Sequence, residues 1–260
     1  MLEAFGVDRG ALAHLEGGEG TSWRAGDLVL KPGLDQRFVA WLASLGEQLD
    51  TGDRFRLANP VAALDGRFVV GGWSATAWMA GEPRPGEVRP LLDVSADLHA
   101  ALRATAIAWP AFLRARTDRW ATADRVAWGE ERPSRFSSPA MSDVFDELDR
   151  FLLKPWRGDA PQLVHADLTG NVLFDEGEEL PPAVIDLSPY FRPALFADAV
   201  VVVDAVAWHD ASLDEAVAFA TASPFSRDAL ARAVVFRLVA APDEIDRYRA
   251  LVHVAAASVG

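Results

Sequence analysis

The first third of the chain alternates short extended segments with turns. Residues 21–24 and 28–31 have the pattern of two strands, and Ala25-Gly26-Asp27 between them is typical of a hairpin turn. After residue 33 the apolar positions recur every three or four residues, which predicts an amphipathic helix that ends near residue 49. The apolar positions of this helix are Leu34, Phe38, Trp41, Leu42, Leu45 and Leu49.

Extended segments return after that helix. Residues 61–64 and 67–71 flank Asp65-Gly66, a pair that favours a tight hairpin turn, and residues 73–79 would form the last strand of the sheet. Residues 80–86 hold two prolines and two glycines, a composition that suits a connector between lobes. We therefore expect an N-terminal lobe of residues 1–80 and a C-terminal lobe of residues 81–260.

The second part of the chain has the apolar spacing of helices. Residues 90–106 and 139–153 are two of them, and several more follow residue 194. Residues 162–187 interrupt this pattern with three short apolar runs, separated by polar loops of the kind that often carries chemistry. The whole pattern predicts an α+β protein, with a small antiparallel sheet in the first lobe and a mainly helical second lobe.

Composition narrows the classes of function. The 260 residues are half hydrophobic, enough for one large domain or two lobes that share a cleft. Because there is no cysteine, catalysis would depend on carboxylates, hydroxyls, His, Lys or a metal held by oxygen ligands. No apolar run reaches the roughly 18 to 20 residues of a membrane span. Residues 1–10 lack a signal-peptide pattern, so we expect no membrane partner and a cytoplasmic location.

The charge of the chain argues against nucleic acid as a partner. The formal net charge is −13, and no basic stripe exists to release counterions from phosphates. Residues 1–90 hold 9 basic and 12 acidic side chains, and residues 91–260 hold 16 and 26. An acidic second lobe would attract a cationic small-molecule substrate to a cleft, although solubility explains the same charge equally well.

Two residue types are rare in this chain. Lysine occurs only at Lys31 and Lys154, and asparagine only at Asn59 and Asn171, whereas all other basic positions are arginine. Arginine replaces lysine freely on a solvated surface, but not where a compact ammonium group must fit among phosphates. A lysine at the end of a strand is ordinarily solvated, but the rarity of Lys31 and its place after a glycine-rich turn favour a phosphate-binding role.

One constellation of polar residues points to phosphoryl transfer. Asp167 precedes Asn171 by four positions, just ahead of an apolar strand, and Asp186 follows the apolar pair Val184-Ile185. Phosphoryl transfer needs a site that orients a hydroxyl, holds Mg²⁺ on the phosphates and offsets developing charge. Asn171 and Asp186 would supply oxygen ligands to Mg²⁺, and Asp167 would orient the attacking hydroxyl or accept its proton. Asp and Asn are also common in turns, where they need no function. That explanation is less favoured here because it would have to hold separately for Asp167, Asn171 and Asp186, in this order along the chain.

These segments resemble the aminoglycoside phosphotransferases, a kinase-like family, and are similar to a divergent member of actinobacterial type. The family's His-Gly-Asp run, which leads to Asn and a hydrophobic strand, is similar to residues 165–174, and its Ile-Asp metal segment is similar to residues 185–186. Residues 97–100 and 196–199 are similar to two further family segments. The likeness spans roughly residues 10–210.

The chain departs from the family pattern at the catalytic loop. Ala166 stands where the family has Gly, and the spacing from Asp167 to Asn171 is one residue shorter than usual. Gly170 can adopt backbone angles that other residues avoid, so it would allow the tighter loop.

The resemblance implies a protein-kinase-like two-lobe fold that binds ATP and Mg²⁺, with Mg²⁺ at Asn171 and Asp186. The phosphates would lie against a glycine-rich turn and Lys31, and the adenine against the backbone of residues 77–80. The cofactor-binding residues are then Gly17, Gly18, Gly20, Thr21, Lys31, Trp78 and Met79. A kinase-like fold also pairs this lysine with a helix carboxylate, for which Asp35 and Glu47 both remain open.

The implied activity is transfer of the ATP γ-phosphoryl group to a hydroxyl of a small molecule, with Asp167 as the catalytic residue. The family uses the equivalent of His165 to support the catalytic loop by hydrogen bonding, and Asp198 is expected to start a helix or tie a loop, with N-cap chemistry as the ordinary explanation. The alternative is a catalytically degenerate kinase-like module that binds nucleotide or regulates a partner, which the short loop before Asn171 favours.

Overall fold

The computed structural model describes residues 2–7, 12–15, 20–133, 138–177 and 179–257. The chain forms two compact units. The first unit is made of residues 1–83, 104–107 and 171–187, and the second of residues 84–103, 108–170 and 188–260. The lobe boundary expected after residue 80 is close to the end of the first segment. Residues 171–187, which were expected in the second lobe, pack with the first unit instead.

Six short strands of the first unit form an antiparallel sheet. Across the sheet they follow the order β1 (Leu12–His14), β2 (Trp23–Ala25), β3 (Leu28–Pro32), β7 (Trp73–Ala77) and β5 (Pro60–Val61), and β6 (Val69–Val70) also pairs with β7. The predicted hairpin of residues 21–31 is confirmed as β2 and β3. The hairpin predicted around Asp65-Gly66 is wrong in its pairing. Residues 63–66 do form a turn, but β5 and β6 each pair with β7 rather than with each other.

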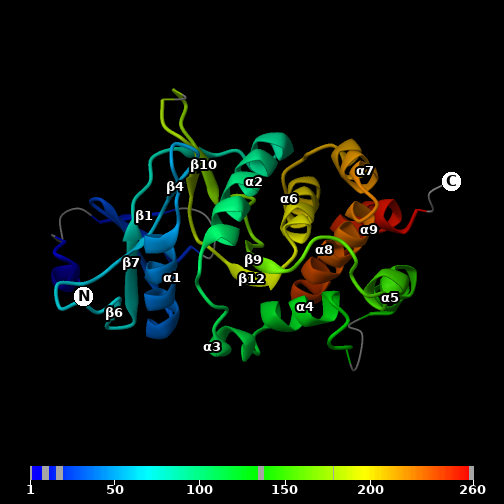
Figure 1. Ribbon diagram of the computed structural model, residues 1–260, viewed down its shortest axis with the longest axis horizontal. Coiled ribbons are helices and arrows are strands. Elements are labelled where there is room, and N and C mark those ends of the chain that lie inside the picture. The colour runs from blue at the N-terminus through cyan, green and yellow to red at the C-terminus, as the bar shows by residue number, and fades with distance from the viewer. Residues whose placement is uncertain (1, 8–11, 16–19, 134–137, 178, 258–260) are drawn as a thin grey trace. The chain divides into compact units, whose positions relative to one another are not determined.

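The predicted helix after the first hairpin is α1 (Gln36–Gln48), labelled in Figure 1, and it packs against β5. It begins at Asp35, whose carboxylate accepts hydrogen bonds from the backbone N–H groups of Arg37 and Phe38 and so acts as the N-cap. A small apolar core lies under the sheet, with the 3₁₀ helix η1 (Leu2–Phe5) against it. Its buried members are Phe5, Ala25, Leu30, Ala63 and Ala75.

A second sheet of four strands joins distant parts of the sequence within the first unit. Its order is β4 (Arg56–Leu57), β11 (Ala183–Val184), β10 (Val172–Phe174) and β8 (Glu82–Pro83). Gly81 allows the chain to lie close to β10, because it has a φ of +129° and a Cβ atom there would be 2.9 Å from the Phe174 carbonyl oxygen. The sheet therefore attaches the Asn171–Asp186 segment to the N-terminal part of the chain.

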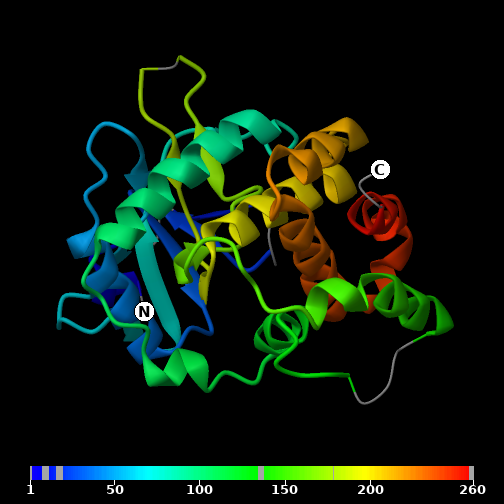
Figure 2. The same ribbon diagram turned by 45° about the vertical axis from the view of Figure 1, so that its right-hand side comes forward.

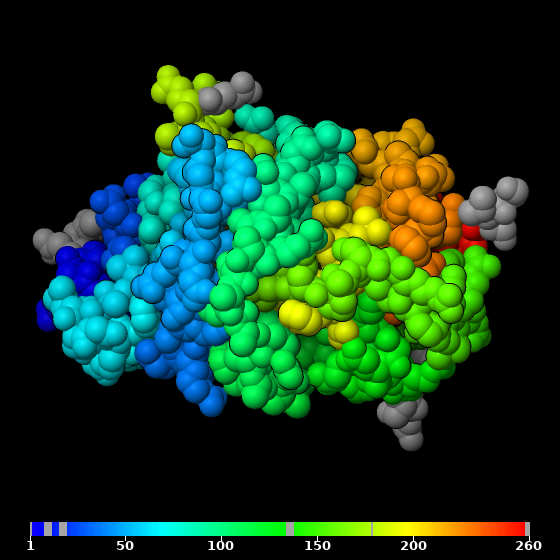
Figure 3. Space-filling view, viewed as in Figure 1, coloured from blue at the N-terminus to red at the C-terminus, as the bar shows by residue number. Residues whose placement is uncertain are grey.

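Helices make up most of the second unit. They are α2 (Val88–Ala104), α3 (Ala111–Arg114), α4 (Arg119–Ala127), α5 (Pro139–Leu152), α6 (Ala194–Trp208), α7 (Leu213–Ala222), α8 (Ser226–Ala240), η3 (Pro242–Glu244) and α9 (Ile245–Ala256). In Figures 1 and 2, α8 runs among α4, α6, α7 and α9 and contacts each of them. Nearly all of its residues are buried, and little of it is visible on the face shown in Figure 3. The core of the unit is therefore built around α8.

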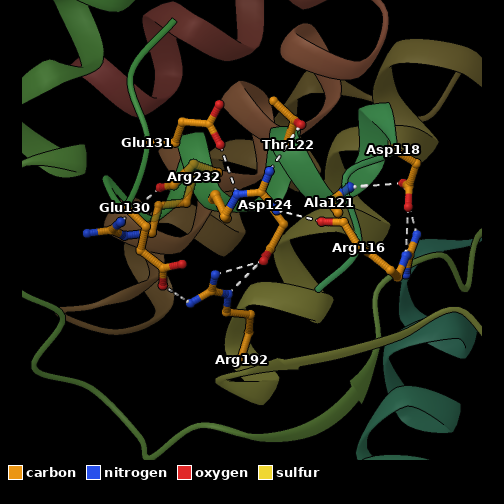
Figure 4. Close-up of polar contacts among 11 residues, drawn as sticks. Arg116, Asp118, Ala121, Thr122, Asp124, Glu130, Glu131, Arg192 and Arg232 are labelled. Atoms are coloured by element: carbon orange, nitrogen blue, oxygen red, sulfur yellow. Dashed lines mark hydrogen bonds and ion pairs between the residues drawn. The ribbon is translucent and has the colours of Figure 1, made fainter. Parts of the chain in front are cut away.

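An antiparallel pair of strands, β9 (Gln162–His165) and β12 (Pro189–Arg192), forms a separate two-stranded sheet, and β9 packs against α6. Figure 4 shows how Arg192 attaches β12 to α4: its guanidinium group donates two hydrogen bonds to Asp124, at 2.8 and 2.7 Å, and one of 2.6 Å to Glu130. Burial raises the pKa of the Asp124 carboxyl, and Arg192 opposes that rise. The ring of Trp128 contacts the guanidinium groups of Arg192 and Arg232, at 5.0 and 4.6 Å. This network fixes β12 against α4.

The α+β class predicted from the hydrophobic pattern is confirmed. In the described part of the chain, no helix combines the length and the apolar character needed to cross a membrane.

Candidate active site

Lys31 lies on β3 of the first unit and forms an ion pair with Asp186, which follows β11. The side chains are 23% and 39% exposed, so both can still reach a ligand. Neither Asp35 nor Glu47, the two carboxylates expected to pair with this lysine, takes that place. Asp35 instead caps α1, and Glu47 is exposed on the same helix. The structure thus brings the predicted phosphate-binding lysine together with a predicted metal ligand.

Asn171 and Asp186 meet at the end of the β10–β11 hairpin. Val172 pairs with Val184, and the Ile185 N–H donates a hydrogen bond of 2.9 Å to the Asn171 carbonyl oxygen, so the two chain ends run side by side. Asp186 has a φ of +51°, a conformation that non-glycine residues adopt rarely and that often marks functional positions. An amide oxygen and a carboxylate suit Mg²⁺, which takes oxygen ligands and keeps several waters when it binds phosphates. The residues present therefore fit this ion.

The predicted nucleotide contacts elsewhere in the first unit are only partly described. Gly17 and Gly18 lie outside the described residues, whereas Gly20 and Thr21 are exposed just before β2. Trp78 follows β7, and its backbone N–H donates to the Asp27 carbonyl oxygen at 2.8 Å. The Arg24 guanidinium lies 4.1 Å from the Trp78 ring centroid.

These Trp78 contacts bear on the adenine segment. Because its N–H already has an acceptor, Trp78 could not also offer that N–H to an adenine. Met79 is half-buried next to it.

Asp167 belongs to the second unit, where it contacts a buried arginine. The Arg237 guanidinium on α8 donates a hydrogen bond of 2.7 Å to Asp167 Oδ1. The same guanidinium binds both carboxylate oxygens of Asp204 on α6, through Nε at 2.8 Å and through Nη2. Burial raises the pKa of Asp204 to about 6, although Arg237 opposes the rise. Despite this contact, 41% of the Asp167 side chain remains exposed.

A cavity of about 220 Å³ opens beside Asp167 within the second unit. Asp167, Asp204 and Arg237 contribute its charged groups, and Trp120, Trp208 and Tyr248 contribute aromatic rings. The Trp208 indole N–H donates to the Tyr248 hydroxyl at 2.8 Å, which leaves the hydroxyl hydrogen of Tyr248 as a donor. The cavity therefore offers carboxylates, a guanidinium group and aromatic walls to a small polar molecule.

Comparisons with known proteins agree with this picture at the level of the fold. No protein-family profile and no curated protein matches the sequence. Among solved structures, the aminoglycoside phosphotransferase from Alicyclobacillus acidocaldarius is 16% identical with a TM-score of 0.58, over 96% of this chain and 90% of that chain. A thermostable mutant of aminoglycoside phosphotransferase APH(4)-Ia, in a ternary complex with ADP and hygromycin B, is 17% identical with a TM-score of 0.59, over 99% and 98%. The chain has the aminoglycoside phosphotransferase fold.

A third structure of this fold, the GDP and kanamycin complex of APH(2")-IIia, is 14% identical with a TM-score of 0.58, over 95% and 91% of the two chains. The kinase-like α+β fold expected from the sequence is therefore confirmed. Sequence identities this low show a shared fold but not a shared reaction. The reaction must therefore be inferred from the residues of this chain.

Within the aminoglycoside phosphotransferase fold of this chain, the residues around Asp167 are held by a buried polar chain. The backbone N–H of His165 donates to His99 Nε2 at 3.1 Å, so the neutral His99 ring carries its proton on Nδ1. Nδ1 can then donate to Ser95 Oγ at 3.1 Å, and the Ser95 hydroxyl donates to Asp198 Oδ1 at 2.5 Å. Burial, together with His165 and Arg103, lowers the pKa of His99 to about 3, which keeps the ring neutral.

His165 also ties the end of β9 to the residue just before β12. Its ring is fully buried, and Nδ1 accepts a hydrogen bond of 3.2 Å from the Ser188 N–H. This geometry supports the structural role that the family resemblance implied for His165. The N-cap role expected for Asp198 is wrong, because Pro193 precedes α6 and Asp198 lies inside that helix, where its carboxylate ties α6 to α2.

Asp198 makes a pH-dependent contribution to stability. Burial raises its pKa to about 6, and Asp159 adds to the rise, so the folded state binds this proton more tightly than the unfolded chain does. Stability is therefore lost as the pH rises from about 4 to about 6. In Asp198→Asn, which can still accept the Ser95 hydrogen bond, the change in unfolding free energy between pH 4 and pH 7 should differ from that of the wild type by up to about 3 kcal/mol. Chemical denaturation at both pH values measures the difference, and identical changes in the two proteins would contradict this assignment.

Asp204 and Arg237 were missed by the sequence analysis, although the sequence carries a signal for them. Asp204 follows a run of four valines, and Arg237 lies between Phe236 and Leu238 in an equally apolar stretch. A charged residue inside an apolar helix is buried only with a partner, so two such residues on different helices are candidates for a pair. The pattern does not say that the partner also reaches Asp167.

Proposed function

We propose that this protein is a phosphotransferase that moves the γ-phosphoryl group of ATP to a hydroxyl of a small molecule, with Asp167 as its catalytic residue. The observation that carries the proposal is the placement of Asp167 at the edge of a cavity lined by polar and aromatic groups. The kinase-like fold supports it, as does the pairing of Lys31 with Asp186 in the other unit.

The first unit would bind the nucleotide. Lys31 is a compact cation beside Asp186 and would contact the phosphates, and the N–H groups of the glycine-rich turn at Gly17, Gly18, Gly20 and Thr21 would lie against them. Asn171 and Asp186 would hold Mg²⁺, which when bound neutralises charge on the phosphate oxygens. Residues Trp78 and Met79 would border the adenine. Solved structures of this fold contain ADP in one case and GDP in another. Both ATP and GTP should therefore be tested as the phosphoryl donor.

The second unit would bind the acceptor. A hydroxyl in the cavity would donate its hydrogen bond to the Asp167 carboxylate, which orients the hydroxyl oxygen for attack on the γ-phosphorus. As the new O–P bond forms, the bond from the γ-phosphorus to the β–γ bridging oxygen breaks, ADP leaves, and Asp167 accepts the hydroxyl proton. Two carboxylates against one guanidinium leave a net negative charge at the cavity when both are ionised, which favours an acceptor that carries a cationic group. We propose a cytoplasmic enzyme without nucleic-acid or membrane partners, in keeping with its acidic charge.

The rival function is a kinase-like module that binds nucleotide without transferring phosphate. The short loop from Asp167 to Asn171 favours it, as does the engagement of Asp167 by Arg237. The short loop is in part explained by Gly170, because its φ of +80° supplies the unusual backbone angle that such a loop needs. Turnover on any hydroxyl acceptor would exclude this rival.

Thermal unfolding with Mg²⁺ alone and with Mg-ATP tests the nucleotide site. Ligand at a hundred times its dissociation constant adds about 2.7 kcal/mol, which corresponds to a rise in Tm of about 5 to 10 °C. We expect this rise in the wild type and a much smaller one in Lys31→Ala and Asp186→Asn. The quantity compared is the ligand-induced shift, because both variants also lose an ion pair.

The chain offers matched controls for both variants. Lys154, the second of two lysines, is 58% exposed, so Lys154→Ala should keep the full shift. Asp143→Asn makes the same chemical change as Asp186→Asn at an exposed position of α5. No shift with either ATP or GTP in the wild type would contradict the proposed function.

A further inference from the structure

Arg237 stands at the centre of the second unit's charged cluster. It comes from α8, the most enclosed helix of the unit, and its side chain is only 8% exposed. The guanidinium meets two carboxylates from separate parts of the chain: Asp204, one turn before the end of α6, and Asp167, which follows β9. Its cationic carbon also lies 5.3 Å from the Trp120 ring centroid on α4. Three elements thus define the position of this one group.

The two carboxylates play different parts. The Asp204 carboxylate accepts hydrogen bonds from both Nε and Nη2 of Arg237. This two-point contact fixes both the position and the plane of the guanidinium. Asp204 is itself buried, with its side chain 10% exposed. From Arg237, Asp167 accepts one hydrogen bond, donated by Nη2, and its side chain remains 41% exposed. Asp204 therefore anchors the arginine, and the arginine holds Asp167.

The electrostatic balance keeps the arginine charged. Burial opposes the charge on Arg237, but Asp204 and Asp167 outweigh it and raise the pKa of the guanidinium above its ordinary value. A buried cation that lost either carboxylate would be poorly compensated, so the three groups stabilise one another's positions. The side chain of Asp167 consequently has much less freedom than a half-exposed aspartate in a loop ordinarily has.

We propose that Arg237, anchored by Asp204, is a positioning residue for phosphoryl transfer: it holds the Asp167 carboxylate at the rim of the cavity in the orientation that receives the acceptor hydroxyl. The inference rests on the proposed function, since it assigns a role in that same reaction. It adds two residues, from α6 and α8, that lie far from the catalytic loop in the sequence. Arg237 does not touch the reacting atoms and acts through Asp167.

Removal of this restraint should affect the turnover rate rather than nucleotide binding. Misplacement of a catalytic group by about 1 Å can lower a rate about 100-fold. We expect a fall of that size in kcat for Arg237→Ala. Lys31, Asn171 and Asp186 belong to the other unit, so the Kd for Mg-ATP should stay within a factor of about two of the wild type.

Arg192 provides a matched control. It too is a largely buried arginine that binds two carboxylates, Asp124 and Glu130 (Figure 4), and it faces the Trp128 ring. None of these three partners is among the residues that line the cavity. Arg192→Ala should lower Tm about as much as Arg237→Ala, yet keep kcat close to that of the wild type. A purely structural role for Arg237 predicts instead that the two variants behave alike.

The experiment measures three quantities: Tm, the Kd for Mg-ATP and the rate of ADP release. The proteins compared are the wild type, Arg237→Ala, Arg237→Lys, Asp204→Asn and Arg192→Ala. The acceptor is the hydroxyl compound that the wild type phosphorylates fastest or, where none is known, water. Guanidinium chloride, far below denaturing concentrations, should partly restore the rate of Arg237→Ala and leave Arg192→Ala unchanged. Arg237→Lys keeps the charge and the fold, but one ammonium cannot reproduce the two-point contact, so its kcat should fall about 10-fold. Asp204→Asn should lower kcat with an unchanged Kd.

Each result has a distinct meaning. An inactive wild type would overturn the proposed function itself. An active wild type whose kcat is unchanged in a folded Arg237→Lys or Arg237→Ala, or is matched by the loss in Arg192→Ala, would overturn only the role of Arg237. A loss of kcat confined to Arg237 and Asp204 variants, with guanidinium rescue and unchanged Mg-ATP binding, would establish that role.

Discussion

Asp167→Asn should lower the rate of phosphoryl transfer about 10²- to 10⁴-fold, the usual effect of removing a general base. The asparagine side chain keeps an oxygen that can accept the hydrogen bond from Arg237, so the local geometry is preserved while the negative charge is lost. Binding of Mg-ATP should persist, because the predicted nucleotide-binding residues lie in the first unit. Steady-state ADP release and the Mg-ATP-induced shift in Tm measure the two properties separately.

The control for this prediction is Asp143→Asn, the same chemical change at an exposed position of α5. It should leave both the rate and the thermal shift unchanged. If Asp167→Asn transferred phosphate as fast as the wild type, Asp167 would neither orient the hydroxyl nor accept its proton, and the mechanism would need a different base.

Arg232→Met should produce the largest loss of stability, about 3 to 5 kcal/mol. Arg232 is only 1% exposed and donates hydrogen bonds to three carbonyl oxygens, those of Ala127, Phe151 and Lys154, at 2.6 to 2.9 Å. It thereby joins the ends of α4 and α5 to α8. Methionine fills much of the same space but leaves the three carbonyls without their donors, and each such buried group costs about 1 to 3 kcal/mol.

Scanning calorimetry should show this loss as a fall in Tm of about 10 °C. Arg232→Lys should lose nearly as much, because burial already lowers the pKa of the arginine to about 10 and a single ammonium cannot reach three carbonyls. Arg249→Met is the matched control, since Arg249 is 54% exposed and its ion pair with Asp246 should contribute less than about 1 kcal/mol. A Tm change for Arg232→Met no larger than that of Arg249→Met would show that the carbonyl contacts contribute little.

Several elements of this protein could be predicted from local patterns. The β2–β3 hairpin, α1, α5 and the three strands between residues 162 and 187 all lie where periodicity and turn residues placed them. The pairing of β5 and β6 was not predictable in the same way. The Asp65-Gly66 turn forms as its sequence indicates, but strand partners depend on which edge of the sheet is open, and the edge of β7 accepts both segments.

In the candidate site, too, the sequence predicted the individual residues but not how they pair. Asp167, Asn171, Asp186 and Lys31 were singled out because their order, spacing and rarity are properties of the sequence. The partner of Lys31 was not predicted from the sequence. The helix carboxylates Asp35 and Glu47 were the near neighbours in the sequence, whereas Asp186 is 155 positions away.

The sequence by itself determined the α+β class, the short strands and amphipathic helices, and the small set of carboxylate, amide and ammonium groups suited to phosphoryl transfer. Those features depend on interactions between residues close together in the chain, or on residue chemistry alone. Only the tertiary structure decided that Asp186 binds Lys31, that Asp198 joins α6 to α2, and that Arg237 and Asp204 hold Asp167. The physical reason is that a charged side chain binds whichever polar or oppositely charged group the packing of distant segments brings within hydrogen-bonding distance, and no local pattern specifies that choice.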